Sequence, residues 1–450
     1  MRSRTSPDAG SSAPSTPAGT GRSSPDSALT LSRRHRFSWA TLLLLSWGCG
    51  GSDGGSDAPA MTVRDSAGIR IVETSAPAWS EGDGWQVEAV PELELGGATA
   101  PPQEHLAMAG DPRSFPDGRV VVGDRRPPGR VAVFSPQGDL LHEVGRPGEG
   151  PGEIVSPGSW LPLGNDTLLV LDLGAGRLSY FGRDGDFLRL TTLDDPATLP
   201  GPELLGRIAS GELTVRMGRP RVLGPGEITR DEAGFALVDP ETGTHRILHE
   251  IEGSERASRT VETDGGRFML IQPRPFGPHF SWAFDGSRFF AGTGVPWEVR
   301  VMEAEGGPMD GGGAARPSEL WRLLEPLEPL SRTRLQAERD SLEAYEVGEV
   351  ASFAQSALDI LDEFSAPESV PAFSSLHADA LGYLWVGEYR VLPEQRFPER
   401  YRVFDPEGRF MGEVTLPEPL KISEIGEDYI LGSAQDPLDA WVIRRFRLVR

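Results

Sequence analysis

A tight turn followed by a short apolar strand recurs six times along this chain of 450 residues. The turns contain glycine, mostly beside Asp, Asn or Ser, and these residues accept the backbone angles that tight turns require. Strands that are apolar on both faces belong in the interior of a sheet. The six strands that follow the turns are RVVVGD, TLLVLD, ELTVRM, RFFAGTG, YLWVGEY and DYILGSA. The repetition predicts an all-β fold built from repeated antiparallel units.

Each unit is completed by further strands that end in another glycine turn, as in VFSPQGD and VFDPEGR. Four strands in roughly 40 to 50 residues form one blade of a β-propeller, so the sequence predicts a six-bladed β-propeller. The last unit has only three strands after Leu420. We expect residues 85–95 to supply its missing strand, because closing the ring removes exposed edges, and residues 69–73 to add to it.

Two segments add residues beyond the four strands of a blade, and neither is long enough to form a whole blade. Residues 254–278 are long enough for an extra hairpin. Residues 331–365 predict an inserted pair of helices, broken near Gly348 and followed by Pro367. The apolar residues at helical spacing in this second segment are Phe353, Ala357, Ile360, Leu361 and Phe364.

The first 48 residues predict export rather than folded structure. Residues 1–30 are rich in Ser, Pro, Thr and Gly, a composition that cannot bury a core, and a basic SRRHR run then precedes an apolar stretch too short to span a bilayer. Cys49, the only cysteine, follows this stretch, as in a bacterial lipoprotein signal, which implies lipidation of Cys49. Leu45 stands four residues before Cys49 instead of three, so ordinary cleavage is the alternative. Residues 49–64 form a flexible linker and residues 65–450 the propeller.

The strongly negative net charge of the chain bears on which partners it can bind. The chain carries 67 acidic and 44 basic side chains, a net charge of −23. Such a surface repels phosphate backbones, so nucleic acid is not expected as a partner. Lys421 is the only lysine, which leaves almost no candidate for Schiff-base chemistry.

The segment VGRPGEGPGEI at 144–154, with LLVLD, RLSYF and RDGDFLRL after it, is similar to the NHL-type repeat and the wider TolB-like propellers. DSAGIRIVE at 65–73 and the closing WVIRRFRLVR resemble a group of exported bacterial six-bladed propeller proteins. This resemblance implies a fold and leaves activity open, because propellers host binding, scaffolding and hydrolysis alike. The gluconolactonase-type members hold a metal with a Glu, two Asn and an Asp. That site does not transfer, since Asn165 is the only asparagine.

Binding residues are expected on the face of the ring that carries the long loops. Residues 272–282 (QPRPFGPHFSW) are the strongest candidate for binding an anionic or aromatic ligand. The alternative is that the aromatic residues pack between blades. Tyr389 and Arg390, with Arg396, form a second candidate at the rim. The candidates in the first stretch are Arg274, Phe276, His279 and Trp282.

A metal site has weaker support. Asp124, Asp172 and Glu388 end central strands at equivalent points and are candidates for a carboxylate-only calcium site. The alternative is that they cap the strand ends by binding loop amides. His245 and His249 lie four residues apart on a predicted strand, but no third ligand accompanies them.

These observations predict a binding or scaffold protein of the cell envelope that recognises a peptide, a glycan or a partner protein through its long-loop face. It is expected to be exported and anchored to a membrane by lipid, facing the periplasm or on the outer membrane. No cofactor is expected for this role. The alternative is an exported hydrolase or lyase with a carboxylate or calcium-assisted site at the channel mouth, so whether the chain is an enzyme stays open.

Overall fold

The computed structural model describes residues 60–450, apart from residues 81, 125–128, 220, 222–223, 264–265, 306–315, 346–348 and 393–396. The predicted export segment, Cys49 and most of the linker lie outside the described residues, as do Gly348 and Arg396. No helix in the described part of the chain is both long enough and apolar enough to cross a membrane.

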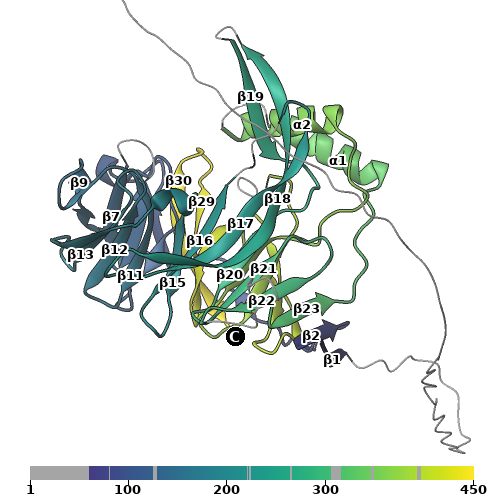
Figure 1. The fold of residues 1–450 in the computed structure, drawn as a ribbon, viewed down its shortest axis with the longest axis horizontal. Helices are drawn as coiled ribbons and strands as arrows, with labels where there is room; N and C mark the ends of the chain where they lie inside the picture. The colour runs from purple at the N-terminus through teal and green to yellow at the C-terminus, as the bar shows by residue number, and fades with distance from the viewer. Residues whose placement is uncertain are drawn as a thin grey trace, which may run out of the picture. The chain divides into compact units, whose positions relative to one another are not determined.

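Six sheets of four or more strands account for most of the described fold, and they follow one another along the chain (Figure 1). In each sheet the neighbouring strands of the repeated unit are consecutive in sequence and antiparallel. The predicted apolar strands are the second strands, and β6 and β12 among them are almost wholly buried.

The first three sheets contain these strands: β5 (Arg113–Ser114), β6 (Val120–Asp124), β7 (Arg130–Phe134), β8 (Leu140–Val144); β11 (Pro157–Leu163), β12 (Thr167–Asp172), β13 (Arg177–Gly182), β14 (Phe187–Thr192); β15 (Glu203–Arg207), β16 (Leu213–Arg219), β17 (Ile228–Val238), β18 (His245–Thr263) and β19 (Gly266–Pro273). Between the first two sheets lies a short parallel pair, β9 (Arg146–Pro147) and β10 (Glu153–Ile154).

The other three sheets contain these strands: β20 (Ser281–Phe284), β21 (Arg288–Gly292), β22 (Val299–Glu303), β23 (Glu319–Leu323), β2 (Ile69–Thr74), β1 (Met61–Ser66); β24 (Phe373–Ala378), β25 (Leu384–Glu388), β26 (Arg400–Phe404), β27 (Phe410–Thr415); β28 (Lys421–Ile425), β29 (Tyr429–Gln435), β30 (Trp441–Val449), β3 (Gln86–Val87) and β4 (Leu93–Gly96).

The first strands of successive sheets lie against one another. Strand β11 contacts β5 and β15, β24 contacts β20 and β28, and β28 contacts β5. Between β15 and β20 the contact is tight, because a Cβ on Gly206 would lie only 2.8 Å from the ring of Phe284. These contacts run from sheet to sheet and return from the sixth sheet to the first.

Segments from before the first sheet complete two later sheets. As predicted for residues 85–95, β3 and β4 pair antiparallel with β30, with Leu93 opposite Arg445. The prediction that residues 69–73 join the same sheet is wrong. Strand β2 pairs in parallel with β23 of the fourth sheet, where Val72 is fully buried and Arg70 lies 2.5 Å from Glu319.

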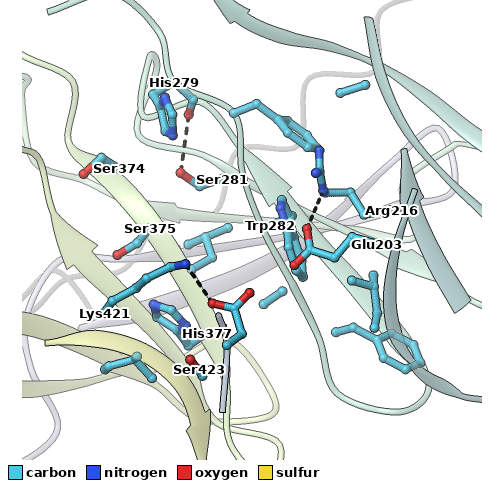
Figure 2. A pocket seen from close by; sticks show the side chains of 18 of the residues that line it. Glu203, Arg216, His279, Ser281, Trp282, Ser374, Ser375, His377, Lys421 and Ser423 are labelled. Carbon is cyan, nitrogen blue, oxygen red and sulfur yellow. Dashed lines mark hydrogen bonds and ion pairs between the residues drawn. The ribbon is translucent and has the colours of Figure 1, made fainter. Parts of the chain in front are cut away.

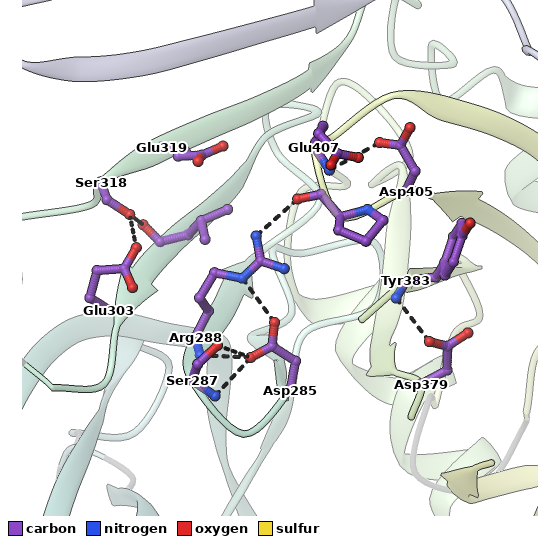
Figure 3. A network of polar contacts seen from close by, with 12 residues as sticks. Asp285, Ser287, Arg288, Glu303, Ser318, Glu319, Asp379, Tyr383, Asp405 and Glu407 are labelled. Carbon is purple, nitrogen blue, oxygen red and sulfur yellow. Dashed lines mark hydrogen bonds and ion pairs between the residues drawn. The ribbon is translucent and has the colours of Figure 1, made fainter. Parts of the chain in front are cut away.

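Aspartates hold the recurring turns by accepting hydrogen bonds from turn amides (Figure 3). Asp285 Oδ1 accepts from the backbone N–H of Ser287 at 2.9 Å and of Arg288 at 2.7 Å. Arg288 also donates to the carbonyl of Pro406 at 2.9 Å and so ties a turn of the fourth sheet to a turn of the fifth. The turn pattern in the sequence therefore reports a repeated local hydrogen-bond motif.

The inserted segment forms two helices, as its apolar spacing predicted. Helix α1 (Arg332–Glu343) begins after Ser331, whose side chain accepts from the N–H of Arg334, and helix α2 (Glu349–Glu363) follows. Both helices cover a separate apolar cluster away from the sheet interiors. Its fully or nearly buried members are Phe276, Leu342, Ala354, Ala357, Leu358, Val370, Tyr389, Val391 and Leu392.

Candidate functional site

A cavity of about 530 Å³ lies among the first strands of the sheets and is the strongest candidate site. We call it the axial cavity. The first strands β15, β20, β24 and β28 line it, together with Asp111, with Arg113 of β5 and with residues of β16, β17 and β18 in the third sheet. Figure 2 shows side chains from these separate elements converging on one space. The contacting sheets thus bring together residues that are far apart in the sequence.

The charges in the axial cavity balance. Five acidic and five basic residues line it, whereas the whole chain has a net charge of −23. Several of them pair directly: Lys421 Nζ lies 2.8 Å from Asp111, Arg216 Nε 3.0 Å from Glu203, and Arg256 pairs with Asp231. The ten residues are Asp111, Arg113, Glu203, Arg216, Arg219, Asp231, Glu232, Arg256, Lys421 and Glu424.

Two histidines line the cavity in their neutral form. Enclosure by the protein lowers the pKa of His279 to about 4, and the nearby charge of Arg256 lowers it further. Enclosure lowers the pKa of His377 to about 4 as well, with Arg113 acting in the same direction. His279 Nδ1 lies 3.4 Å from Ser254 Oγ, at the long limit of a hydrogen bond. Near neutral pH, each imidazole offers one donor and one acceptor and no charge.

Trp282 supplies part of the aromatic surface of the cavity, which Phe280, Phe284, Phe397 and Tyr401 also line. Trp282 lies on β20 and is half-buried, and the Arg216 guanidinium carbon is 5.8 Å from its ring centroid. Glu203 holds Arg216 in this position, as Figure 2 shows. The hydroxyl of Ser281, the neighbouring residue, donates to the backbone carbonyl of His279 at 3.4 Å rather than to an imidazole. The cavity therefore combines an aromatic surface, paired charges and neutral polar groups.

The stretch 272–282 contributes its second half to this cavity. His279 and Trp282 line it, but Arg274 and Phe276 do not. Arg274 lies 2.7 Å from Glu255 and donates to the carbonyl of Ser365 after α2. Phe276 is fully buried under the two helices. These two residues join parts of the fold together.

The second predicted group, Tyr389 and Arg390, also lies outside the axial cavity. The Tyr389 hydroxyl accepts from the backbone N–H of Phe276 at 2.7 Å, in the apolar cluster under the helices. Arg390 lies 2.5 Å from Glu388 and lines a second, peripheral pocket of about 420 Å³. That pocket lies between the outer parts of the fourth and fifth sheets, and other arginine and glutamate residues, such as Arg402 and Glu413, also line it.

The three candidate calcium ligands have other partners. Asp124 accepts from the N–H groups of Ala107 and Met108 at 2.9 and 3.0 Å. Asp172 accepts in the same way from two loop amides and lies 3.4 Å from Arg177. The side chain of Glu388 contacts Arg390 and also Arg400, the latter at 2.8 Å. Within the described ranges, no group of three or more His, Cys, Asp or Glu side chains is arranged to hold a metal ion.

The two histidines on β18 have separate surroundings. His245 Nε2 lies 2.7 Å from the hydroxyl of Thr198 on the surface. His249 is buried against the rings of Phe235 and Phe289. They do not share a ligand-binding position.

Sequence reasoning missed most of the axial cavity. Asp111, Glu203, His377 and Lys421 lie on or beside first strands, which carry no turn motif and little apolar signal, and Arg216 is a single basic residue within the apolar second strand β16. A usable signal was present in the polar residues that precede each recurring turn by a few positions. The first strands of neighbouring sheets contact one another, so their polar side chains can face a shared space.

No protein-family model and no curated protein matches the sequence. Solved structures with a similar course of the chain include an exported protein of Bacteroides fragilis, described as putative, with 12% identity and a TM-score of 0.43, covering 84% of this chain and 99% of the other. A member of the DUF4221 family from Bacteroides vulgatus has 14% identity and a TM-score of 0.44, with coverage of 81% and 98%. The calcium-binding protein regucalcin of Agrobacterium tumefaciens has 11% identity and a TM-score of 0.37, with coverage of 81% and 94%. Likeness at this level assigns neither a family nor an activity to this chain.

Proposed function

We propose that this chain is an exported, six-bladed β-propeller that binds a neutral glycan in its axial cavity. The six sheets are its blades. Support for a closed ring comes from the contacts that link the first strands in order and return from β28 to β5. Export and attachment through lipidated Cys49 are supported by the basic run and apolar stretch that precede this cysteine. The protein would then present its cavity to ligands in the cell envelope.

The balance of charge in the axial cavity is the observation that carries the glycan proposal. An anionic or cationic ligand would need an excess of the opposite charge, and the cavity has five acidic and five basic residues. Sugar hydroxyl groups both donate and accept, so they can bind alongside carboxylate–guanidinium pairs such as Glu203–Arg216 without breaking charge neutrality. Trp282 offers the apolar surface on which a sugar ring can pack.

Screening the purified chain against an array of oligosaccharides, followed by calorimetry on each hit, tests this function. The array should include neutral sugars, uronate-containing sugars and peptides. We expect hits among the neutral sugars, and Trp282→Ala should weaken their binding by about tenfold or more, because it removes a central aromatic contact. Phe187→Ala is the matched control, since Phe187 is an exposed aromatic residue of β14 outside the cavity. Hits confined to peptides or acidic sugars, or equal affinity for both variants, would overturn the proposal.

A hydrolase or lyase acting in the same cavity is the second candidate. The observation that favours it is the pair of neutral imidazoles, His279 and His377, because only a neutral imidazole can accept a proton from a substrate. Calcium assistance would require a bound ion. Metal analysis of the purified chain, with thermal unfolding in calcium and in EDTA, tests that requirement, and product formation from array hits tests turnover. Stoichiometric metal together with turnover would favour the enzyme; intact ligand recovered after incubation would favour binding.

A further inference from the structure

Strand β19 forms an open edge of the third sheet. It is the last strand in the order β15-β16-β17-β18-β19 and pairs only with β18 within the described part of the chain. The β18–β19 ribbon projects away from the sheets, beside the two helices (Figure 1). Open edges present unpaired backbone groups to other strands.

The register identifies which backbone groups of β19 point outward. Ile271 is opposite Ser258, and Ser258 uses its own N–H and C=O on its other side, with Glu227 and Gly226, each at 3.0 Å. The Ser258–Ile271 pair is therefore not hydrogen-bonded across the ribbon, and the N–H and C=O of Ile271 face away from β18. Met269, two residues earlier, faces the same way.

The open edge has little of the usual protection against pairing, since its only charged side chain is Arg267. Its register with β18 is continuous and contains no bulge. Phe268 is 49% and Met269 38% exposed, and the strand Gly266–Pro273 contains no acidic residue. Natural edges are normally blunted by bulges, prolines or charges, and here Pro273 comes only at the strand end.

The ribbon is also held in place by contacts with α2 and with a residue that follows α2 shortly after. Arg259 of β18 pairs with Asp359 of α2 and lies 3.8 Å from Glu363. Arg274, just after β19, donates to the carbonyl of Ser365. A strand fixed in this way loses little conformational freedom when a second strand pairs with it.

We infer that β19 pairs with β19 of a second copy, antiparallel, to form a dimer. We place the two strands so that Met269 of one copy lies opposite Ile271 of the other. In this register the outward N–H and C=O groups of Met269 and Ile271 form hydrogen bonds with those of the second copy. Leu270 meets Leu270 on the two-fold axis, and Arg267 meets Pro273, so no like charges are opposed. A second copy fits because β19 itself has no acidic side chain, so pairing two copies of this strand opposes no carboxylates across the new strand pair although each chain has a net charge of −23.

Disulfide trapping across the two-fold axis tests the register. In the purified chain carrying Cys49→Ser, Leu270→Cys places two thiols opposite each other and should form a disulfide-linked dimer under mild oxidation. Phe268→Cys is the matched control, because position 268 lies opposite position 272 and not opposite itself. Cross-linking of Phe268→Cys as fast as Leu270→Cys would overturn the proposal.

Light scattering over a wide range of protein concentration tests the dimer without cysteine chemistry. The mass should rise from 48.6 kDa toward twice that value as concentration increases. Met269→Pro removes one outward donor and should return the chain to a monomer, while Met269→Ala keeps the donor and should retain more of the dimer. The proposal is wrong if the unmodified chain stays monomeric throughout or if both variants dimerise equally.

Discussion

The two halves of the stretch 272–282 have different surroundings in the fold, although they are only a few residues apart. Phe276 lies fully buried under α1 and α2, in an apolar cluster. His279 and Trp282 line the polar axial cavity. The difference comes from what covers each half: two helices from the insertion at 331–365 cover the first, while strands of several sheets surround the second. A short stretch of aromatic and basic residues therefore takes its role from partners distant in the sequence.

Polar groups also have different kinds of partner in the cluster under the helices and in the axial cavity. The cluster under the helices satisfies the N–H of Phe276 with one hydroxyl, that of Tyr389. The axial cavity contains ion pairs such as Asp111–Lys421. The charged groups of these pairs can form hydrogen bonds with a ligand as well as with each other. Substitutions in the first region should therefore change folding stability, and substitutions in the second should change binding.

Phe276→Ala should have the largest effect on stability. It leaves a cavity in a fully buried cluster, so the free energy of unfolding should fall by about 3–5 kcal/mol. Urea unfolding measures the change. Trp282→Ala, at a half-buried position in the cavity, should cost much less stability, and equal losses for the two variants would erase the distinction between the regions.

The two cavity histidines should make stability depend on pH. The pKa of each is about 4 in the folded chain and near 6.5 when unfolded. Between these values the unfolded chain binds protons that the folded chain does not, so the free energy of unfolding falls as pH falls from 6.5 toward 4. The slope is about 1.4 kcal/mol per pH unit for each histidine, roughly 3 kcal/mol by pH 4.

His377→Gln isolates one of these contributions from the acidic groups that also titrate in this range. The variant should lose less stability than the unmodified chain on acidification, as measured by thermal or urea unfolding at several pH values. Parallel pH profiles for the two proteins would show that His377 is not held neutral in the cavity.

Tyr389→Phe should have a smaller effect than Phe276→Ala. It keeps the ring in the cluster but removes the hydroxyl that accepts from the Phe276 N–H at 2.7 Å. An unsatisfied buried donor costs about 1–3 kcal/mol. Urea unfolding gives the loss, and glycan affinity should be unchanged. A variant that binds glycan more weakly at full stability would place Tyr389 in the binding site.

The fold could be predicted from the sequence further than the site could. Turn motifs and apolar strands are local, so the second strands of all six sheets and the helix pair were identified. The pairing of β4 with β30 followed from the missing strand in the last unit. The pairing of β2 with β23 was missed because a parallel edge contact leaves no local signal. The axial cavity draws polar residues from five sheets, several of them from the third, and no short pattern in the sequence joins them.

The most direct test of the central claim uses Lys421, the only lysine of the chain and a residue of the axial cavity. Its rate of acylation by an amine-specific reagent, resolved from the N-terminus by peptide mapping, should fall severalfold when a neutral oligosaccharide hit saturates the protein. Trp282→Ala should remove this protection at the same sugar concentration. An unchanged rate with a sugar shown to be bound would place the glycan elsewhere and contradict the assignment of the axial cavity.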